Sequence, residues 1–120
     1  MGQPVVHFEI GCKDAARTSE FYSKLFDWKI EQSGGPSAMI DTGSKAGIHG
    51  HITALGHEPH RYINIYAEVD DVQAFVDRAV ALGGKTVVPP TDVPGQGKFA
   101  WIADPEGTIV GLWKSLEPRA

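Results

Sequence analysis

The 120-residue chain repeats its own pattern, and adding 57 to a position in the first half gives its counterpart in the second. The residues related in this way include His7 and Asn64, Asp14 and Asp71, Leu25 and Leu82, and Ile30 and Val87. Each half reads as a strand, a helix and three further strands. The repeat therefore predicts two tandem βαβββ modules and an α+β fold. Each helix can cover only one face of its sheet, which leaves the other face open.

The two predicted helices share the same start signal, an aspartate that can accept hydrogen bonds from the first-turn amides. Apolar residues then recur at the i, i+3, i+4 spacing of one helix face. In the first helix, which should end near Asp27, this face holds Thr18, Phe21, Tyr22, Leu25 and Phe26. In the second it holds Val72, Phe75, Val76, Ala79 and Val80, and Gly83 and Gly84 end the helix.

Alternating patterns predict the strands. They fall at 5–10, 28–31, 38–41, 47–53, 62–69, 85–88, 98–103 and 108–114. Pro89 and Pro90 are expected to interrupt the sixth strand. The stretch 104–107, Asp-Pro-Glu-Gly, predicts a tight hairpin. One domain is expected over 3–115, with modules at about 5–53 and 62–114, a linker at 54–61 and a tail at 116–120.

The first strand carries an unusual polar pair. Val6, Phe8 and Ile10 form an apolar face, whereas His7 and Glu9 share the other. Polar groups on a half-buried strand cost free energy unless they meet polar partners, so this side is the first candidate site. Alternation places further polar and aromatic candidates on the same side of the other strands: His49, His51, Tyr62, Asn64, Tyr66, Gly111 and Trp113. Trp101 could hold a flat ligand or be buried in the core.

Composition excludes several classes of partner. The net charge is −4 and there is no basic run, which argues against nucleic acid. No apolar stretch approaches the ~20 residues that span a bilayer, and the first residues lack the pattern of a signal peptide. The single cysteine, Cys12, fits a reducing compartment, so we expect a cytoplasmic protein.

Several short motifs, in this order and spacing, resemble the vicinal oxygen chelate superfamily, which groups glyoxalase I, bleomycin-resistance proteins and extradiol dioxygenases. They are the run 5–10, Phe21-Tyr22, the run 25–28, Tyr66, the runs 69–71 and 82–84, and the run 103–107. The resemblance implies a cup made by a curved mixed sheet, with helices outside and a small-molecule ligand inside. Members of this superfamily are often dimers, so the resemblance also implies a homodimer.

The resemblance further implies where metal ligands would stand. Metal-dependent members place them on the first and last strands of each module, which here gives His7, His49, Asn64 and Gly111. Gly111 has no side chain where the metal enzymes usually carry glutamate. Zinc, nickel, iron or manganese at His7 and His49 stays an alternative, since His49 and His51 also have the i, i+2 spacing of a divalent site.

Three functions remain open from the sequence. The first is a binding protein for a small organic molecule without a full metal site, with ligand contacts from His7, Glu9, His51, Tyr62, Asn64, Tyr66, Trp101 and Trp113. The second is a metal-dependent lyase, isomerase or dioxygenase with Glu9 as the catalytic base. The third is a non-catalytic dimeric interaction subunit.

Overall fold

The computed structural model describes residues 2–32, 36–54 and 61–116. Its contacts divide the chain into two compact units. One, here called the N-terminal unit, is His7–Asn64. The other, the C-terminal unit, combines the residues before His7 with those from Ile65 onward. Each unit is described by itself.

The N-terminal unit contains the first βαβββ module. Its elements are β1 (Val5–Gly11), α1 (Ala15–Phe26), β2 (Lys29–Gln32), β3 (Ser37–Asp41) and β4 (His49–Thr53). The strands lie in the order β2-β3-β4-β1, with β1 parallel to β4 and the other neighbours antiparallel. The module order predicted from the sequence is therefore confirmed here.

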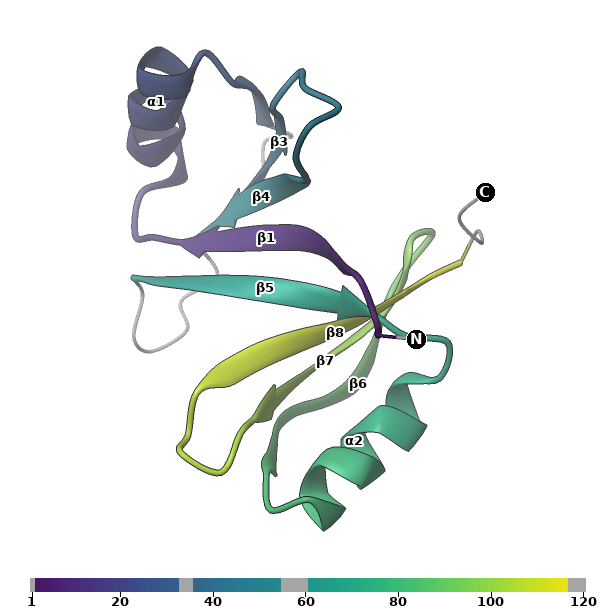
Figure 1. The fold of residues 1–120 in the computed structure, drawn as a ribbon. Coiled ribbons are helices and arrows are strands. Elements are labelled where there is room, and N and C mark those ends of the chain that lie inside the picture. The colour runs from purple at the N-terminus through teal and green to yellow at the C-terminus, as the bar shows by residue number, and fades with distance from the viewer. Residues whose placement is uncertain (1, 33–35, 55–60, 117–120) are drawn as a thin grey trace. The chain divides into compact units, whose positions relative to one another are not determined.

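The C-terminal unit repeats the arrangement. It contains most of β5 (Tyr62–Glu68), α2 (Val72–Ala81), β6 (Lys85–Val93), β7 (Gly97–Ala103) and β8 (Ile109–Ser115). The strand order is β5-β8-β7-β6, with β5 parallel to β8 and the other pairs antiparallel. In Figure 1, α1 lies beside β3 and β4, and α2 lies beside β6 and β7. The predicted α+β fold of two βαβββ modules with mixed strand pairing is confirmed.

Both helices begin at the predicted aspartates. The carboxylate of Asp14 accepts from the amide of Arg17 at 3.0 Å, and that of Asp71 accepts from the amide of Ala74 at 3.0 Å. α1 ends at Asp27, whose φ of 60° is the left-handed conformation common at helix ends. The two capping aspartates thus fix the same start in each copy of the repeat.

Each unit has its own hydrophobic core between helix and sheet. In the N-terminal unit the buried cluster is Ile10, Cys12, Ile40 and Ile52. In the C-terminal unit it is Val69, Val72, Val76, Ala100 and Leu112. The thiol of Cys12 is buried and lies 3.5 Å from the carbonyl oxygen of Thr53. Cys12 is therefore a packing residue of the first core.

The apolar face predicted for α1 is not buried as a whole. Phe21, Leu25 and Phe26 are 59%, 57% and 52% exposed, whereas Ser19 is the buried residue of this helix. Tyr22 makes the inward contact by stacking on Trp28 at 5.8 Å between ring centroids. The apolar face of α1 is wider than the part of the sheet that the helix covers. Phe21, Leu25 and Phe26 therefore remain exposed to solvent.

The end of the sixth strand also needs correction. Pro89 and Pro90 do not end the sixth strand, because β6 continues to Val93 with register shifts around the prolines. β6 lies at the end of the strand order, where a missing amide is tolerated. On β5, Ile63 lies between the same-side residues Tyr62 and Asn64, faces the other way and is 74% exposed. Residues 55–60 of the expected linker and 117–120 of the expected tail lie outside the described residues.

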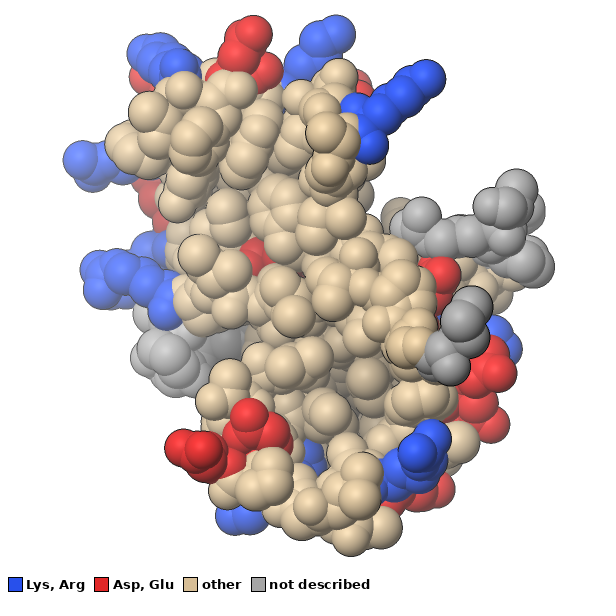
Figure 2. Space-filling model, in the orientation of Figure 1, with Lys and Arg blue, Asp and Glu red and all other residues tan. Residues whose placement is uncertain are grey.

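Acidic and basic side chains are mixed on one face of the molecule. On the side shown in Figure 2, Lys and Arg side chains stand beside Asp and Glu side chains instead of gathering in one patch. Across residues 2–32, 36–54 and 61–116, none of the helices has both the length and the apolar character needed to span a bilayer.

Candidate functional site

A buried carboxyl group is the centre of the polar contacts in the N-terminal unit. Glu9, on β1, is only 3% exposed. The hydroxyl of Tyr62, on β5, donates a hydrogen bond to Oε2 of Glu9. Nε2 of His51, on β4, lies 3.5 Å from Oε1 of Glu9. We call His7, Glu9, His51 and Tyr62 the Glu9 cluster.

The two imidazoles of this cluster are joined directly. Nε2 of His7 lies 2.6 Å from Nδ1 of His51. The parallel register of β1 and β4 brings them together, because Glu9 is opposite His51 and His7 is two residues before Glu9 on the same side. The carboxyl group favours a proton on Nε2 of His51, so that Nδ1 accepts the hydrogen bond from His7.

A glycine makes room for the phenol ring of Tyr62. Gly11 ends β1, and a Cβ atom at this position would overlap the ring carbons of Tyr62. The absence of a side chain at Gly11 therefore allows the Tyr62 hydroxyl to approach Glu9. Sequence reasoning missed this role, and its only signal was a glycine at the end of a strand.

Burial sets the charge state around the carboxyl group. Burial lowers the pKa of His51, and the charge of Glu9 opposes this only in part. Burial, followed by the hydrogen bond and charge of Glu9, raises the pKa of Tyr62 well above its ordinary value. At neutral pH the imidazole of His51 and the phenol of Tyr62 are therefore neutral beside Glu9, which suits hydrogen bonding and proton transfer.

Asn64 lies on the same side of β5 as Tyr62, two residues further along the strand. It is 3% exposed. Within the described part of the chain, neither its Oδ1 nor its Nδ2 has a hydrogen-bond partner. Buried amides in folded proteins are nearly always paired, so this side chain needs an explanation.

The remaining predicted ligand contacts belong to the C-terminal unit. The indole nitrogen of Trp101 donates to the hydroxyl of Tyr66 at 2.8 Å, and both side chains are buried. The indole nitrogen of Trp113 donates to Oγ of Ser115 at 2.9 Å. Contacts thus join four of the predicted residues, namely His7, Glu9, His51 and Tyr62, and separately join Tyr66 with Trp101.

Two of the residues at the positions where the resemblance puts metal ligands have other contacts within the N-terminal unit. Nδ1 of His49 accepts from the amide of Thr42 at 3.1 Å and lies 3.5 Å from Asp41, whereas His7 faces His51. Gly111 offers no donor, and the ring of Tyr66 fills the space where its side chain would stand. Among the residues with described positions, no three His, Cys, Asp or Glu side chains are grouped to hold a metal ion.

The sequence pattern of the Glyoxalase/Bleomycin resistance protein/Dioxygenase superfamily matches residues 5–112. The chain belongs to this family, which confirms the resemblance seen in the sequence motifs.

Curated relatives come from the bacterial genera Mycobacterium and Streptomyces. A protein named glyoxylase CFP32, from Mycobacterium tuberculosis (strain CDC 1551 / Oshkosh), is 32% identical over 114 residues, covering 85% of this chain and 42% of the relative. The anthracycline biosynthesis protein DnrV of Streptomyces peucetius is 29% identical over 124 residues, covering 89% of this chain and 45% of the relative. The chain therefore spans less than half the length of these relatives.

Solved structures agree on the fold. One is the Mn(II)-bound glyoxalase of Novosphingobium aromaticivorans, with a TM-score of 0.68 and 15% identity. That match covers 94% of this chain and 38% of the glyoxalase. At this identity the likeness concerns the fold alone.

Proposed function

We propose that this chain binds a small organic molecule at the Glu9 cluster of the N-terminal unit. The observation that carries the proposal is the buried carboxyl group of Glu9, with Tyr62 and His51 arranged around it. The core gains nothing from a buried carboxyl group with two half-buried imidazoles beside it, because desolvating the carboxyl group costs free energy. Such groups are typical of sites where a ligand is recognised or a proton is moved.

The proposal gives the residues distinct roles. His7, His51, Tyr62 and Asn64 contact the ligand, and Glu9 acts as the base if the molecule is turned over, as in a lyase or dioxygenase of this family. Tyr66 and Trp101 bond to each other, which supports packing over ligand contact, and Trp113 stays a predicted contact. The lone buried Cys12 still favours a cytoplasmic setting.

A ligand screen by thermal shift tests this function, because a ligand that binds only the folded state raises its Tm. The protein is stripped of metal and screened against small carbonyl and hydroxyl compounds, with and without Mn²⁺ or Zn²⁺. Hits are expected without metal, and Glu9→Gln should abolish them. His49→Gln is the matched control, since His49 bonds outside the cluster and should keep the response. Hits that appear only with metal would support the metal-dependent alternative.

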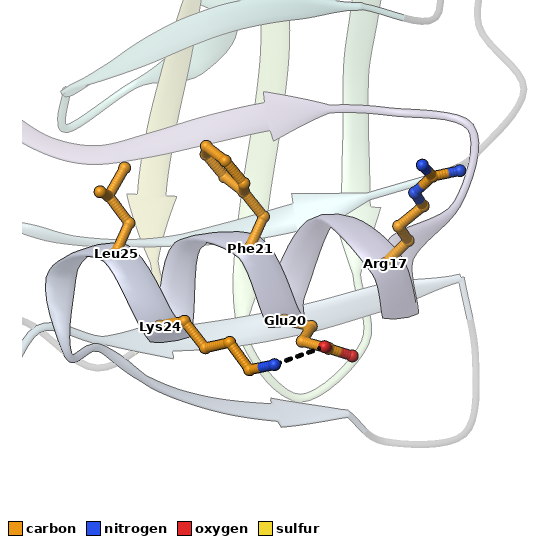
Figure 3. A pocket seen from close by; sticks show the side chains of 5 residues that line it. All are labelled: Arg17, Glu20, Phe21, Lys24 and Leu25. Carbon is orange, nitrogen blue, oxygen red and sulfur yellow. Dashed lines mark hydrogen bonds and ion pairs between the residues drawn. The ribbon is translucent and has the colours of Figure 1, made fainter.

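A second candidate function is self-association through α1. Phe21 and Leu25 are more than half exposed and line a shallow groove with Arg17, Glu20 and Lys24. Figure 3 shows Phe21 and Leu25 on one side of the helix, while Lys24 reaches Glu20 on the other, with 2.8 Å between nitrogen and oxygen. Neighbouring exposed apolar side chains of this kind favour a protein partner, and we propose a second copy of the chain.

Light scattering after size-exclusion chromatography tests the homodimer. Leu25→Lys should convert a dimer into a monomer at micromolar concentration. Leu82→Lys is the matched control, because Leu82 is a 76% exposed leucine just beyond α2. A wild-type protein that is monomeric throughout would exclude this candidate.

A further inference from the structure

Among the ligand contacts proposed above, Asn64 has an unpaired buried amide that bears on the kind of ligand. Its carboxamide is buried, at 3% exposure, and both polar atoms lack partners among the residues whose positions are described. An unpaired buried amide loses its hydrogen bonds to water on folding and receives nothing in return. A leucine would fill a similar volume without this cost, so stability alone does not account for an asparagine here.

The direction of the side chain follows from β5. Burial along the strand alternates, with Ile63 exposed and Asn64 buried on the side that Tyr62 shares. Tyr62 bonds to Glu9 from this same side. Asn64 therefore stands one strand repeat from the Glu9 cluster, on the face that carries it.

Ser19 provides a contrast within the same unit. Its hydroxyl is also buried and unpaired within the described ranges. It lies inside α1, however, where a rotation about χ1 can bring a serine hydroxyl within reach of the carbonyl oxygen one turn earlier, although the structure does not show that bond. An asparagine in a strand has no such helix carbonyl within reach. The missing partners of Asn64 therefore need a different explanation from those of Ser19.

We propose that the Asn64 carboxamide recognises a neutral ligand group whose hydrogen-bond donor and acceptor are bonded to the same carbon atom, as in a carboxamide. This inference rests on the proposed function, since it names the kind of molecule that the Glu9 cluster would receive. Oδ1 accepts and Nδ2 donates within one plane, so only a paired donor and acceptor satisfy both.

Two other ligand classes fit less well. A metal ion would engage Oδ1 and leave Nδ2 unpaired, because Nδ2 is a donor only. An anionic group would come close to the buried carboxyl group of Glu9, and like charges repel strongly away from water. A neutral group with both functions avoids both costs.

The first test needs no ligand. Asn64→Leu should keep or raise the Tm of the free protein, because it removes two unpaired polar groups. Ser19→Ala is the matched control for removing a buried, unpaired polar atom, and it should leave ligand binding unchanged. A clear fall in Tm for Asn64→Leu would overturn the inference, because the amide would then be a structural group.

The second test uses three probes that share a ring: benzamide, N,N-dimethylbenzamide and benzoate. Benzamide should shift the side-chain NH₂ signals of Asn64 in ¹H–¹⁵N spectra and bind about 10-fold more tightly than the other two, as expected for one lost donor–acceptor pairing. Asn64→Leu should remove this preference.

The outcomes separate this inference from the proposed function. If benzamide moves the backbone signals of Glu9 and His51 but not the Asn64 amide, the binding site stands and the inference fails. If the Asn64 NH₂ protons show contacts to water alone, the amide holds a water molecule and the inference fails. If the library screen yields no ligand that depends on Glu9, the proposed function itself fails.

Discussion

In both units a tyrosine ring packs over a glycine, but the two tyrosine hydroxyls have different hydrogen-bond partners. In the N-terminal unit the ring of Tyr62 packs over Gly11, and in the C-terminal unit the ring of Tyr66 packs over Gly111. Both tyrosines come from β5. The hydroxyl of Tyr62 donates to the carboxyl group of Glu9, whereas the hydroxyl of Tyr66 accepts from the indole of Trp101.

The two units differ in the side chains that surround each tyrosine hydroxyl. Around Tyr62 stand a buried carboxyl group and two imidazoles, all able to exchange protons. The bond between Tyr66 and Trp101 joins a hydroxyl oxygen to an indole N–H, and neither side chain is a carboxyl group or an imidazole. The position where metal enzymes of this family carry a glutamate is Gly111, and here the Tyr66 ring fills that space. The repeat therefore preserves the packing of a tyrosine ring over a glycine, and on the function proposed above the acid–base chemistry belongs to the N-terminal unit.

The glycines provide the largest expected effect. Gly11→Ala and Gly111→Ala should each lower the free energy of unfolding by about 1–3 kcal/mol, because the new Cβ would overlap a tyrosine ring. Urea unfolding measures this. Gly47→Ala is the control, since nothing lies near its added Cβ, and it should stay within about 0.5 kcal/mol of wild type.

A double variant sharpens the argument for the ring. Removing the ring with Tyr66→Ala should make Gly111→Ala nearly harmless, so the two changes should be strongly non-additive. Additive effects would show that the cost at Gly111 comes from something other than the Tyr66 ring.

The hydroxyl groups should give the next largest effect. Tyr62→Phe should cost about 2 kcal/mol, since a buried carboxyl group loses a donor, and Tyr66→Phe about 1 kcal/mol, since a neutral pair is lost. The same urea measurements rank the two. A larger loss for Tyr66→Phe would contradict the contrast between an acidic and a neutral partner.

The smallest effect concerns pH. Burial holds the pKa of His51 below its ordinary value of 6.5, so the unfolded chain binds more protons than the folded one in mild acid. The contribution of neutral His51 to stability is complete above about pH 6.5 and declines as the pH falls below that value. His51→Gln should therefore flatten the fall in stability between about pH 7 and 5, whereas the control His49→Gln should leave the contribution of His51 in place.

Much of the fold could be predicted because its signals are local. The caps at Asp14 and Asp71 and the apolar spacing between them act within a single helix. The placement of His7 and Glu9 on one strand face needed only the two-residue period. The internal repeat added the order of the two modules, which the structure confirms.

The contacts of the site depended on strand pairing and could not be predicted. The bond between His7 and His51 follows from the parallel register of β1 and β4, which no residue pattern specifies. Strand alternation puts His49 on the same side as His51, and only the structure shows that His49 lies against Thr42 and Asp41 instead of His7. The exposure of Phe21 was missed because helical spacing gives a face but not the width of sheet that covers it.

The most direct test of the central claim compares Tyr62→Phe with Tyr66→Phe in the same metal-free ligand screen. If ligand chemistry belongs to the N-terminal unit, Tyr62→Phe should lose most of the thermal shift that hits give with wild type. Tyr66→Phe should keep that shift despite its lower starting Tm. Loss of the ligand response in Tyr66→Phe, with full retention in Tyr62→Phe, would contradict the account.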